Sequence, residues 1–233
     1  MYSFNFLGKD SFLDFGIAVE KRPPIPKPER NIDYVDIPGR SGSLKVDYKT
    51  YKDIIIPIQC WYIGKDDVVE KADEIKAWLD GGEGDLILSN QPDKKYIAHV
   101  SGEIDITQEM RVLGEFLVNF RCQPFKYLVS NDVITLTSTP STVNNIGTVA
   151  AQPVVKIYGT GDIDLTVNAA VIHLTCITDY ITIDSVLMDA YKDTALMNAN
   201  MNGEFPILQA GANVIEWTGT VDRIEITPNW RWL

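Results

Sequence analysis

The sequence predicts a mainly β protein that carries a single α-helix. Apolar and polar residues alternate along most of the chain, which is the pattern of strands with one buried face. One such face holds four apolar residues, Phe116, Val118, Phe120 and Cys122. Turn-forming stretches such as GTGD (159–162) and QAGAN (209–213) separate these segments at short intervals. This spacing is typical of antiparallel sandwiches or barrels, rather than of βαβ units.

The first distinctive element is a long hairpin around PGRSG (38–42). Residues 34–38 predict one strand, and residues 45–62 predict a return strand that is too long for a tight turn. A lone two-stranded hairpin is marginal in water, so we expect it to pack on another molecule. Gly39 and Gly42 would permit backbone angles that re-aim the hairpin where it leaves its domain. The expected contact residues are Pro38, Gly39, Arg40, Gly42, Leu44, Val46 and Tyr48.

Two other interpretations of this stretch compete with an interface. One is an exposed surface loop that has no partner. The other is a catalytic nucleophile elbow, which requires Gly-x-Ser-x-Gly ahead of a helix. Here the second glycine, Gly42, follows Ser41 directly and so lies one place too early, and strand-like residues follow. The elbow is therefore disfavoured.

Residues 66–82 (DDVVEKADEIKAWLDGG) break the β pattern. Their apolar residues recur at helical spacing and form one stripe: Val68, Val69, Ala72, Ile75, Trp78 and Leu79. Asp66 suits the N-cap, and Gly81 with Gly82 suits the C-terminal stop. The segment predicts a helix of about four turns, laid against a sheet.

A change of composition near residues 129–152 predicts a domain boundary. This stretch is rich in Ser, Thr and Asn and poor in aromatic residues. We expect an N-terminal domain over 1–129 and a low-charge β-sandwich over 130–233. The proline-rich segment KRPPIPKPER (21–30) predicts an extended connector, with a polyproline ligand as the alternative.

Charge and segment lengths exclude several partners. Lys and Arg number 21 and Asp and Glu 32, which gives a formal charge of −11 and disfavours nucleic-acid binding. No apolar run approaches the roughly 20 residues that span a bilayer, and no signal-peptide pattern follows Met1. Cys122 and Cys176 alternate with inward-facing residues, which predicts buried free thiols and synthesis in a reducing cytoplasm.

No constellation of residues predicts catalysis. The two histidines, His99 and His173, both fall in strand-like segments without the partners of a triad. Neither they nor the dispersed cysteines have metal-ligand spacing, so we expect no metal, no cofactor and no enzyme activity. Trp217 shares a strand face with Ile215, which favours core packing over a sugar-stacking role.

Several segments, in their order along the chain, together resemble one known family. They are FNFLGKDSFLDFGI (4–17), IDYVDIPGRSGSL (32–44), LILSNQPDKKYIAHV (86–100), FLVNFRCQPFKY (116–127), NNIGTVAAQPVVKIYGTGDIDLTVN (144–168), YITIDS (180–185), GEFPILQAGANVIEW (203–217) and IEITPNWRWL (224–233). Over nearly its whole length the chain resembles the distal tail proteins of siphophages, often called Dit. Ser41 stands where that family usually has Asp.

The resemblance implies a structural protein of the virion. It implies an N-terminal β-sandwich with one helix and a projecting hairpin, six copies of which form a ring around a central channel for DNA. It also implies a peripheral C-terminal sandwich like a galectin or a carbohydrate module. Such a ring joins the tail tube protein to the tail-associated lysin or tail-tip protein and to receptor-binding or baseplate proteins. The adjacent subunit is then the expected partner of the hairpin.

A carbohydrate-binding module that attaches the particle to host cell-wall glycans is the alternative function. Galectin-type recognition uses His, Asn and Arg clustered beside an exposed Trp. His173 and Trp217 are the candidate residues, but His173 has no Arg-rich neighbourhood in the sequence.

Overall fold

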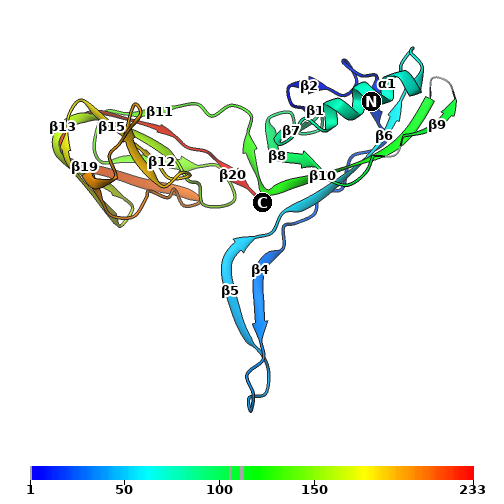
Figure 1. Ribbon diagram of the computed structural model, residues 1–233. Coiled ribbons are helices and arrows are strands. Elements are labelled where there is room, and N and C mark those ends of the chain that lie inside the picture. Colours follow the sequence, from blue (N-terminus) through cyan, green and yellow to red (C-terminus); the bar gives the residue numbers. More distant parts are fainter. Residues whose placement is uncertain (1, 105, 111–112) are drawn as a thin grey trace. The chain divides into compact units, whose positions relative to one another are not determined.

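The computed structural model describes residues 2–104, 106–110 and 113–233. The chain divides into two compact units, an N-terminal unit over Met1–Val129 and a C-terminal unit over Ser130–Trp232. Both are built almost entirely of strands (Figure 1), which confirms the mainly β fold. In the described residues the one α-helix is α1 (Val68–Leu79).

The N-terminal unit is a curled antiparallel sheet. Its strands are β1 (Phe4–Phe6), β2 (Lys9–Asp10), β3 (Ile17–Val19), β6 (Ile54–Tyr62), β7 (Gly84–Leu88), β8 (Lys94–Val100), β9 (Thr107–Met110) and β10 (Leu113–Leu128). They follow the order β2-β1-β7-β8-β10-β6-β3, and β9 pairs with β10. A bridge between Tyr2 and Val19 brings the start of β1 to the far edge strand β3, so the sheet closes on itself.

Helix α1 packs one side against this curled sheet and exposes the other. Trp78 stacks on Phe15 with ring centroids 4.3 Å apart, and its Nε1 donates a hydrogen bond to the Phe6 carbonyl at 3.0 Å. The predicted stripe is buried except for Val69, which is 62% exposed. The N-cap is Asp67 rather than Asp66, because the Asp67 side chain accepts the N–H of Val69. The helix therefore begins one residue later than predicted.

A separate two-stranded sheet, β4 (Arg30–Val35) and β5 (Leu44–Tyr51), extends from the N-terminal unit (Figure 1). We call Arg30–Tyr51 the arm. The predicted return strand over 45–62 is real but interrupted, because β5 ends at Tyr51 and β6 begins at Ile54.

The C-terminal unit is a second antiparallel assembly. Its elements are β11 (Ile134–Leu136), β12 (Ser141–Asn145), β13 (Val154–Val167), β14 (Ala170–Ile177), β15 (Tyr180–Asp184), β16 (Asp189–Lys192), β17 (Ala195–Leu196), the 3-10 helix η1 (Asn198–Asn200), β18 (Met201–Asn202) and β19 (Gly211–Thr227). The short β20 (Arg231–Trp232) follows and is not a strand of this sheet. The order β11-β19-β13-β15-β16-β17 runs across it, with β12 on β19 and β14 on β13 and β18.

The long strands β13 and β19 pair in both halves of β13, on either side of an interruption. The first half of β13 also pairs with β15, and its second half pairs with β14. Between the halves the register slips at Thr160 and Asp164, which marks a bulge. Gly219 lies at this crossing with φ of +94°, and a Cβ there would come within 2.4 Å of the Asp162 carbonyl oxygen. Only glycine fits this position without displacing β13.

Gly219→Ala is accordingly expected to destabilise the C-terminal unit. The left-handed backbone alone costs about 1–3 kcal/mol for a residue with a Cβ, and displacement of β13 adds to it. Gly161→Ala is the matched control, because Gly161 also has a positive φ of +79° but no atom within 4 Å of the added Cβ. Urea unfolding should show the larger loss for Gly219→Ala. Equal losses would mean that the close approach is unimportant.

The cysteines follow the predicted alternation only in part. Cys122 is buried as expected, and Cys60 is buried as well, so burial raises the pKa of each thiol to about 12. Cys176 is exposed, and its prediction as a buried thiol is wrong. A bulge in β14 is the reason: the register moves between the pairs Ile163–Leu174 and Gly161–Ile177, and Cys176 adopts a φ of +57°.

Candidate assembly site

The arm is a regular antiparallel ribbon with a fixed register. Its ladder runs from Val35 opposite Leu44 to Ile32 opposite Asp47, and resumes with Arg30 opposite Tyr51 after an irregularity. At that irregularity Lys49 has a φ of +58° and donates its N–H to the Asp47 carboxylate at 2.8 Å. This hydrogen bond, with the nearby Arg30, holds the pKa of Asp47 below its usual value. A bulge of this kind increases the local twist of a ribbon.

Three of the predicted contact residues share one face of the arm. Leu44, Val46 and Tyr48 alternate along β5, and the cross-strand partners Asp33 and Val35 place their side chains on the same face. The Tyr48 hydroxyl donates to Asp33 at 2.8 Å, which raises the pKa of Tyr48. Three apolar members are exposed, Val35 at 48%, Leu44 at 42% and Tyr48 at 52%, and Val46 is half-buried. The face is therefore apolar, ordered by its own cross-strand contacts and open to a partner.

The other predicted residues form the tip. Because Val35 pairs with Leu44, residues 36–43 are the connection at the far end of the ribbon, and Pro38, Gly39, Arg40 and Gly42 lie there. Gly39 and Gly42 have φ of +83° and +82°, which reverses the chain. Their expected role at the base of the hairpin is wrong, since the reversal takes place at the tip.

Aromatic and ionic contacts hold the base of the arm. Tyr51 packs edge-on against Phe125 of β10 at 5.7 Å between ring centroids, and the Arg30 guanidinium lies 5.7 Å from the Tyr51 ring. Lys52 pairs with Glu29 at 3.3 Å. Exposed ion pairs add little stability. The contact between Tyr51 and Phe125 is therefore the principal one that orients the arm.

The arm and its connector carry a charge opposite to that of the rest of the chain. Residues 21–52 contain eight Lys and Arg but four Asp and Glu, a formal charge of +4. The whole chain is −11, so the remaining residues carry −15. Most of this positive charge lies outside the arm, because residues 30–51 contain four Lys and Arg and three Asp, a formal charge of +1.

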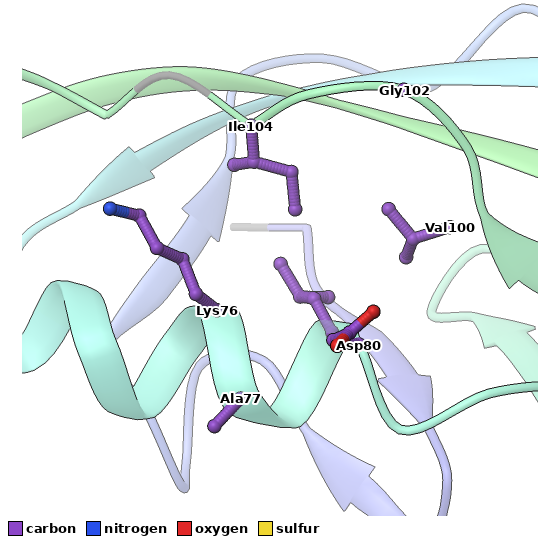
Figure 2. Close-up of a pocket in the computed structure, with 7 residues that line it drawn as sticks. Lys76, Ala77, Asp80, Val100, Gly102 and Ile104 are labelled. Atoms are coloured by element: carbon purple, nitrogen blue, oxygen red, sulfur yellow. The ribbon is translucent and has the colours of Figure 1, made fainter.

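A pocket of about 340 Å³ lies between the C-terminal half of α1 and the segment that follows β8. Lys76 and Asp80 on α1 face Val100 and Ile104 across it (Figure 2). Its described lining offers one amine, on Lys76, and one carboxylate, on Asp80, and both side chains are exposed.

The two residues of the carbohydrate hypothesis do not form one site. His173 pairs across the sheet with Asp164, and its Nδ1 lies 2.7 Å from the Asp164 carboxylate on the outer face. Trp217 pairs with Leu165, the next position along β13, so its side chain lies on the opposite face. Trp217 is half-buried rather than fully internal.

Sequence reasoning missed a ladder of cations and aromatic rings on the C-terminal unit. The Arg223 guanidinium lies 3.6 Å from the Tyr158 ring, and Lys156 Nζ lies 4.0 Å from the Tyr180 ring. Lys192 Nζ lies 5.0 Å from Tyr180. The residues come from four strands, so only their pairing across the sheet reveals the group. Each of the two tyrosine rings already has cations within 5.0 Å. The rings therefore interact with cations of the same chain and do not offer free faces on which a ligand could stack.

The described residues give no sign of a membrane span or a metal centre. No helix among them is long and apolar enough to cross a bilayer. Likewise, the part of the chain that the structure describes brings no three potential ligands from His, Cys, Asp and Glu together.

Comparison with known proteins finds one matching family model and one similar solved structure. Residues 13–122 match the family model described as the phage tail protein RIFT-related domain. Over 100% of both chains, the structure is similar to the crystal structure of the Dit protein (gp 19.1) of phage SPP1, with a TM-score of 0.78 and 12% sequence identity. That protein is described as a paradigm of the hub adsorption apparatus in phages that infect Gram-positive bacteria. No curated protein matches the chain by sequence.

Proposed function

We propose that this protein is the distal tail hub of its virion. The chain carries a phage tail RIFT-related domain on the fold of a distal tail protein. These two matches confirm its resemblance to the siphophage distal tail proteins. Family and fold are those of a structural phage tail protein. In the proposed role, six copies form a ring around a channel that DNA crosses. The ring joins the tail tube protein to the tail-tip or baseplate proteins, the tail-associated lysin and the receptor-binding proteins.

The main support for this proposal is the exposed arm. It leaves the N-terminal unit as a separate two-stranded sheet and exposes Val35, Leu44 and Tyr48. A ribbon of this kind gains stability when it packs on another surface. Arm and body present different surfaces, so a contact between them is head-to-tail, and a head-to-tail contact closes into a ring when its rotation divides the circle.

The remaining features agree with a virion component made in the host cytoplasm. The body of the protein is acidic, and an acidic ring lumen lets DNA pass without the counterion release that makes Lys and Arg arrays adhere to it. The C-terminal unit, a sandwich-like assembly in its own right, is proposed as the peripheral domain. In this role the protein acts through binding and position alone.

Electron microscopy and light scattering of the purified protein test the proposal. We expect rings with a central hole at high concentration, and six subunits of 26.1 kDa give a mass of about 157 kDa. A two-fold dimer as the only assembled species would contradict the proposal, because a two-fold contact uses the same patch on both copies.

A further inference from the structure

The turn between β15 and β16 in the C-terminal unit exposes three consecutive apolar residues. Asp184 of β15 pairs with Asp189 of β16, so residues 185–188 connect the two strands. The exposed fractions are 58% for Val186, 66% for Leu187 and 64% for Met188. Turns in water are usually built from Gly, Asn, Asp, Ser and Pro. Chain reversal alone therefore does not account for this sequence.

Hydrogen bonds hold the turn in one conformation. The Asp184 carboxylate accepts the N–H of Val186 at 2.9 Å and that of Leu187 at 3.0 Å. Met188 has a φ of +59°, a left-handed backbone that is unfavourable for a residue with a Cβ. The three side chains are thus presented by a preorganised turn, which lowers the entropic cost of binding a partner.

A groove of about 230 Å³ lies beside the turn. Its lining residues are Met188, Asn198, Met201, Gly203 and Phe205. The groove is smaller than the roughly 300 Å³ at which small-molecule pockets begin, so it suits a side chain of a larger partner. The flexible methionines allow its shape to adapt to that side chain.

Turn and groove together form one exposed apolar surface. We call it the turn patch, and its residues are Val186, Leu187, Met188, Met201 and Phe205. Asn198 ties the groove to the strand that follows the turn, since its Oδ1 accepts the Ala190 N–H at 2.6 Å and its Nδ2 donates to Asp189 at 2.8 Å. An exposed apolar patch rimmed by polar residues marks a site of protein interaction.

The rim of the turn patch is acidic. Residues 157–191 and 193–222 contain nine Asp and Glu but no Lys or Arg. Asp189 directly follows Met188 of the turn, and the exposed Glu204 lies between two residues that line the groove. The C-terminal unit as a whole has four Lys and Arg but eleven Asp and Glu, a formal charge of −7.

The four cations of the C-terminal unit are engaged with other groups. Lys156, Lys192 and Arg223 contact the tyrosine rings of the ladder described above. Arg231 donates to the Ala150 carbonyl and to the Gln152 side chain, both at 2.9 Å. The carboxylates at the rim of the turn patch are therefore left for cations of another molecule.

We propose that the turn patch binds another protein through an apolar segment flanked by Lys or Arg. The inference goes beyond the hub role, because it rests on the C-terminal unit alone. Leu187 enters an apolar site of the partner, and an apolar side chain of the partner enters the groove. Asp189 and Glu204 meet the partner's cations at the rim, where charge sets orientation and speeds association.

Charge disfavours two other occupants of the turn patch. A two-fold contact with a second copy places the patch against itself, which brings the same carboxylates of both copies together. Like charges at an interface are unfavourable. A bilayer surface with anionic lipids attracts basic segments, and it repels an acidic rim in the same way.

Binding of two synthetic peptides to the full chain tests the inference. One peptide has a core of Leu and Phe flanked by Lys, and the other has the same core flanked by Glu. We expect fluorescence anisotropy to show saturable binding of the basic peptide only. Leu187→Asp should weaken this binding at least about tenfold, as for a central interface residue. The new carboxylate attracts Lys, so such a loss reports the apolar contact.

Leu13→Asp is the matched control, since Leu13 is 82% exposed and belongs to the N-terminal unit. It should bind the basic peptide like the unmodified chain. Glu204→Lys tests the rim, and it should weaken binding of the basic peptide about two- to fivefold and strengthen binding of the acidic peptide by a similar factor. Circular dichroism verifies that each variant is folded.

Three results of the peptide experiment would overturn the inference. They are no saturable binding of the basic peptide, equal affinity of both peptides for the unmodified chain, and unchanged binding by Leu187→Asp. Sedimentation and flotation with vesicles of phosphatidylglycerol and phosphatidylcholine test the other occupants. We expect Leu187→Asp to self-associate like the unmodified chain and neither protein to float. Self-association or flotation that Leu187→Asp abolishes would assign the turn patch to a second copy or to a membrane instead. None of these results bears on the arm, so the hub proposal is tested separately.

Discussion

A protein without its arm is expected to fold and to lose assembly completely. In this variant a short Gly-Ser turn replaces residues 31–50 and joins Arg30 to Tyr51, which already face each other across the ribbon. The arm is a sheet of its own, and its apolar residues Val35, Leu44 and Tyr48 are exposed, so its removal takes little from the core. Assembly should fall from rings to monomers over the accessible range of concentration.

Circular dichroism and light scattering measure folding and assembly of this variant separately. The matched control replaces only the tip residues Pro38–Gly42 with a glycine turn and retains both strands of the arm. If the apolar face of the ribbon makes the contact, the control assembles and the armless protein does not. Loss in both would move the contact to the tip and Arg40. Rings from the armless protein would place the interface elsewhere and remove the observation on which the hub proposal stands.

Local patterns predicted the elements of the fold well, because each depends on neighbours in sequence. The apolar stripe over 68–79 identified α1, and its period correctly buried Ile75 and Trp78. The choice between Asp66 and Asp67 as N-cap failed because both aspartates suit that position, and only the hydrogen bond to Val69 separates them. The hairpin was likewise predicted, but its register was not. Without the pairing of Val35 with Leu44, the two glycines could not be assigned to the tip.

Properties that depend on pairing across strands escaped prediction. Cys176 continues an alternating pattern in the sequence, but a bulge opposite Asp162 turns it outward. His173 and Trp217 were grouped as polar and aromatic candidates, although the register of β13 places them on opposite faces.

Trp78→Ala is expected to cause the largest loss of stability in the N-terminal unit. Trp78 is 6% exposed, stacks on Phe15 at 4.3 Å and on Phe4 at 5.6 Å, and joins α1 to the sheet through its hydrogen bond to Phe6. Truncation of a buried Trp removes this packing and leaves a cavity, at a cost of about 3–5 kcal/mol. The high helix propensity of Ala recovers only a few tenths of a kcal/mol.

Calorimetry of the full chain checks this prediction, because a defect in one unit should lower one unfolding transition. Trp78→Phe retains an aromatic ring but removes the N–H, so its hydrogen-bond loss should amount to about 1 kcal/mol. Val69→Ala on the same helix is the surface control, since Val69 is 62% exposed, and should change stability by no more than about 0.5 kcal/mol. If the Trp78→Ala protein is as stable as the Val69→Ala protein, the packing of Trp78 does not contribute substantially to the stability of this core. A single transition that shifts as a whole would instead show that the two units unfold together, and that the core around Trp78 stabilises the whole chain.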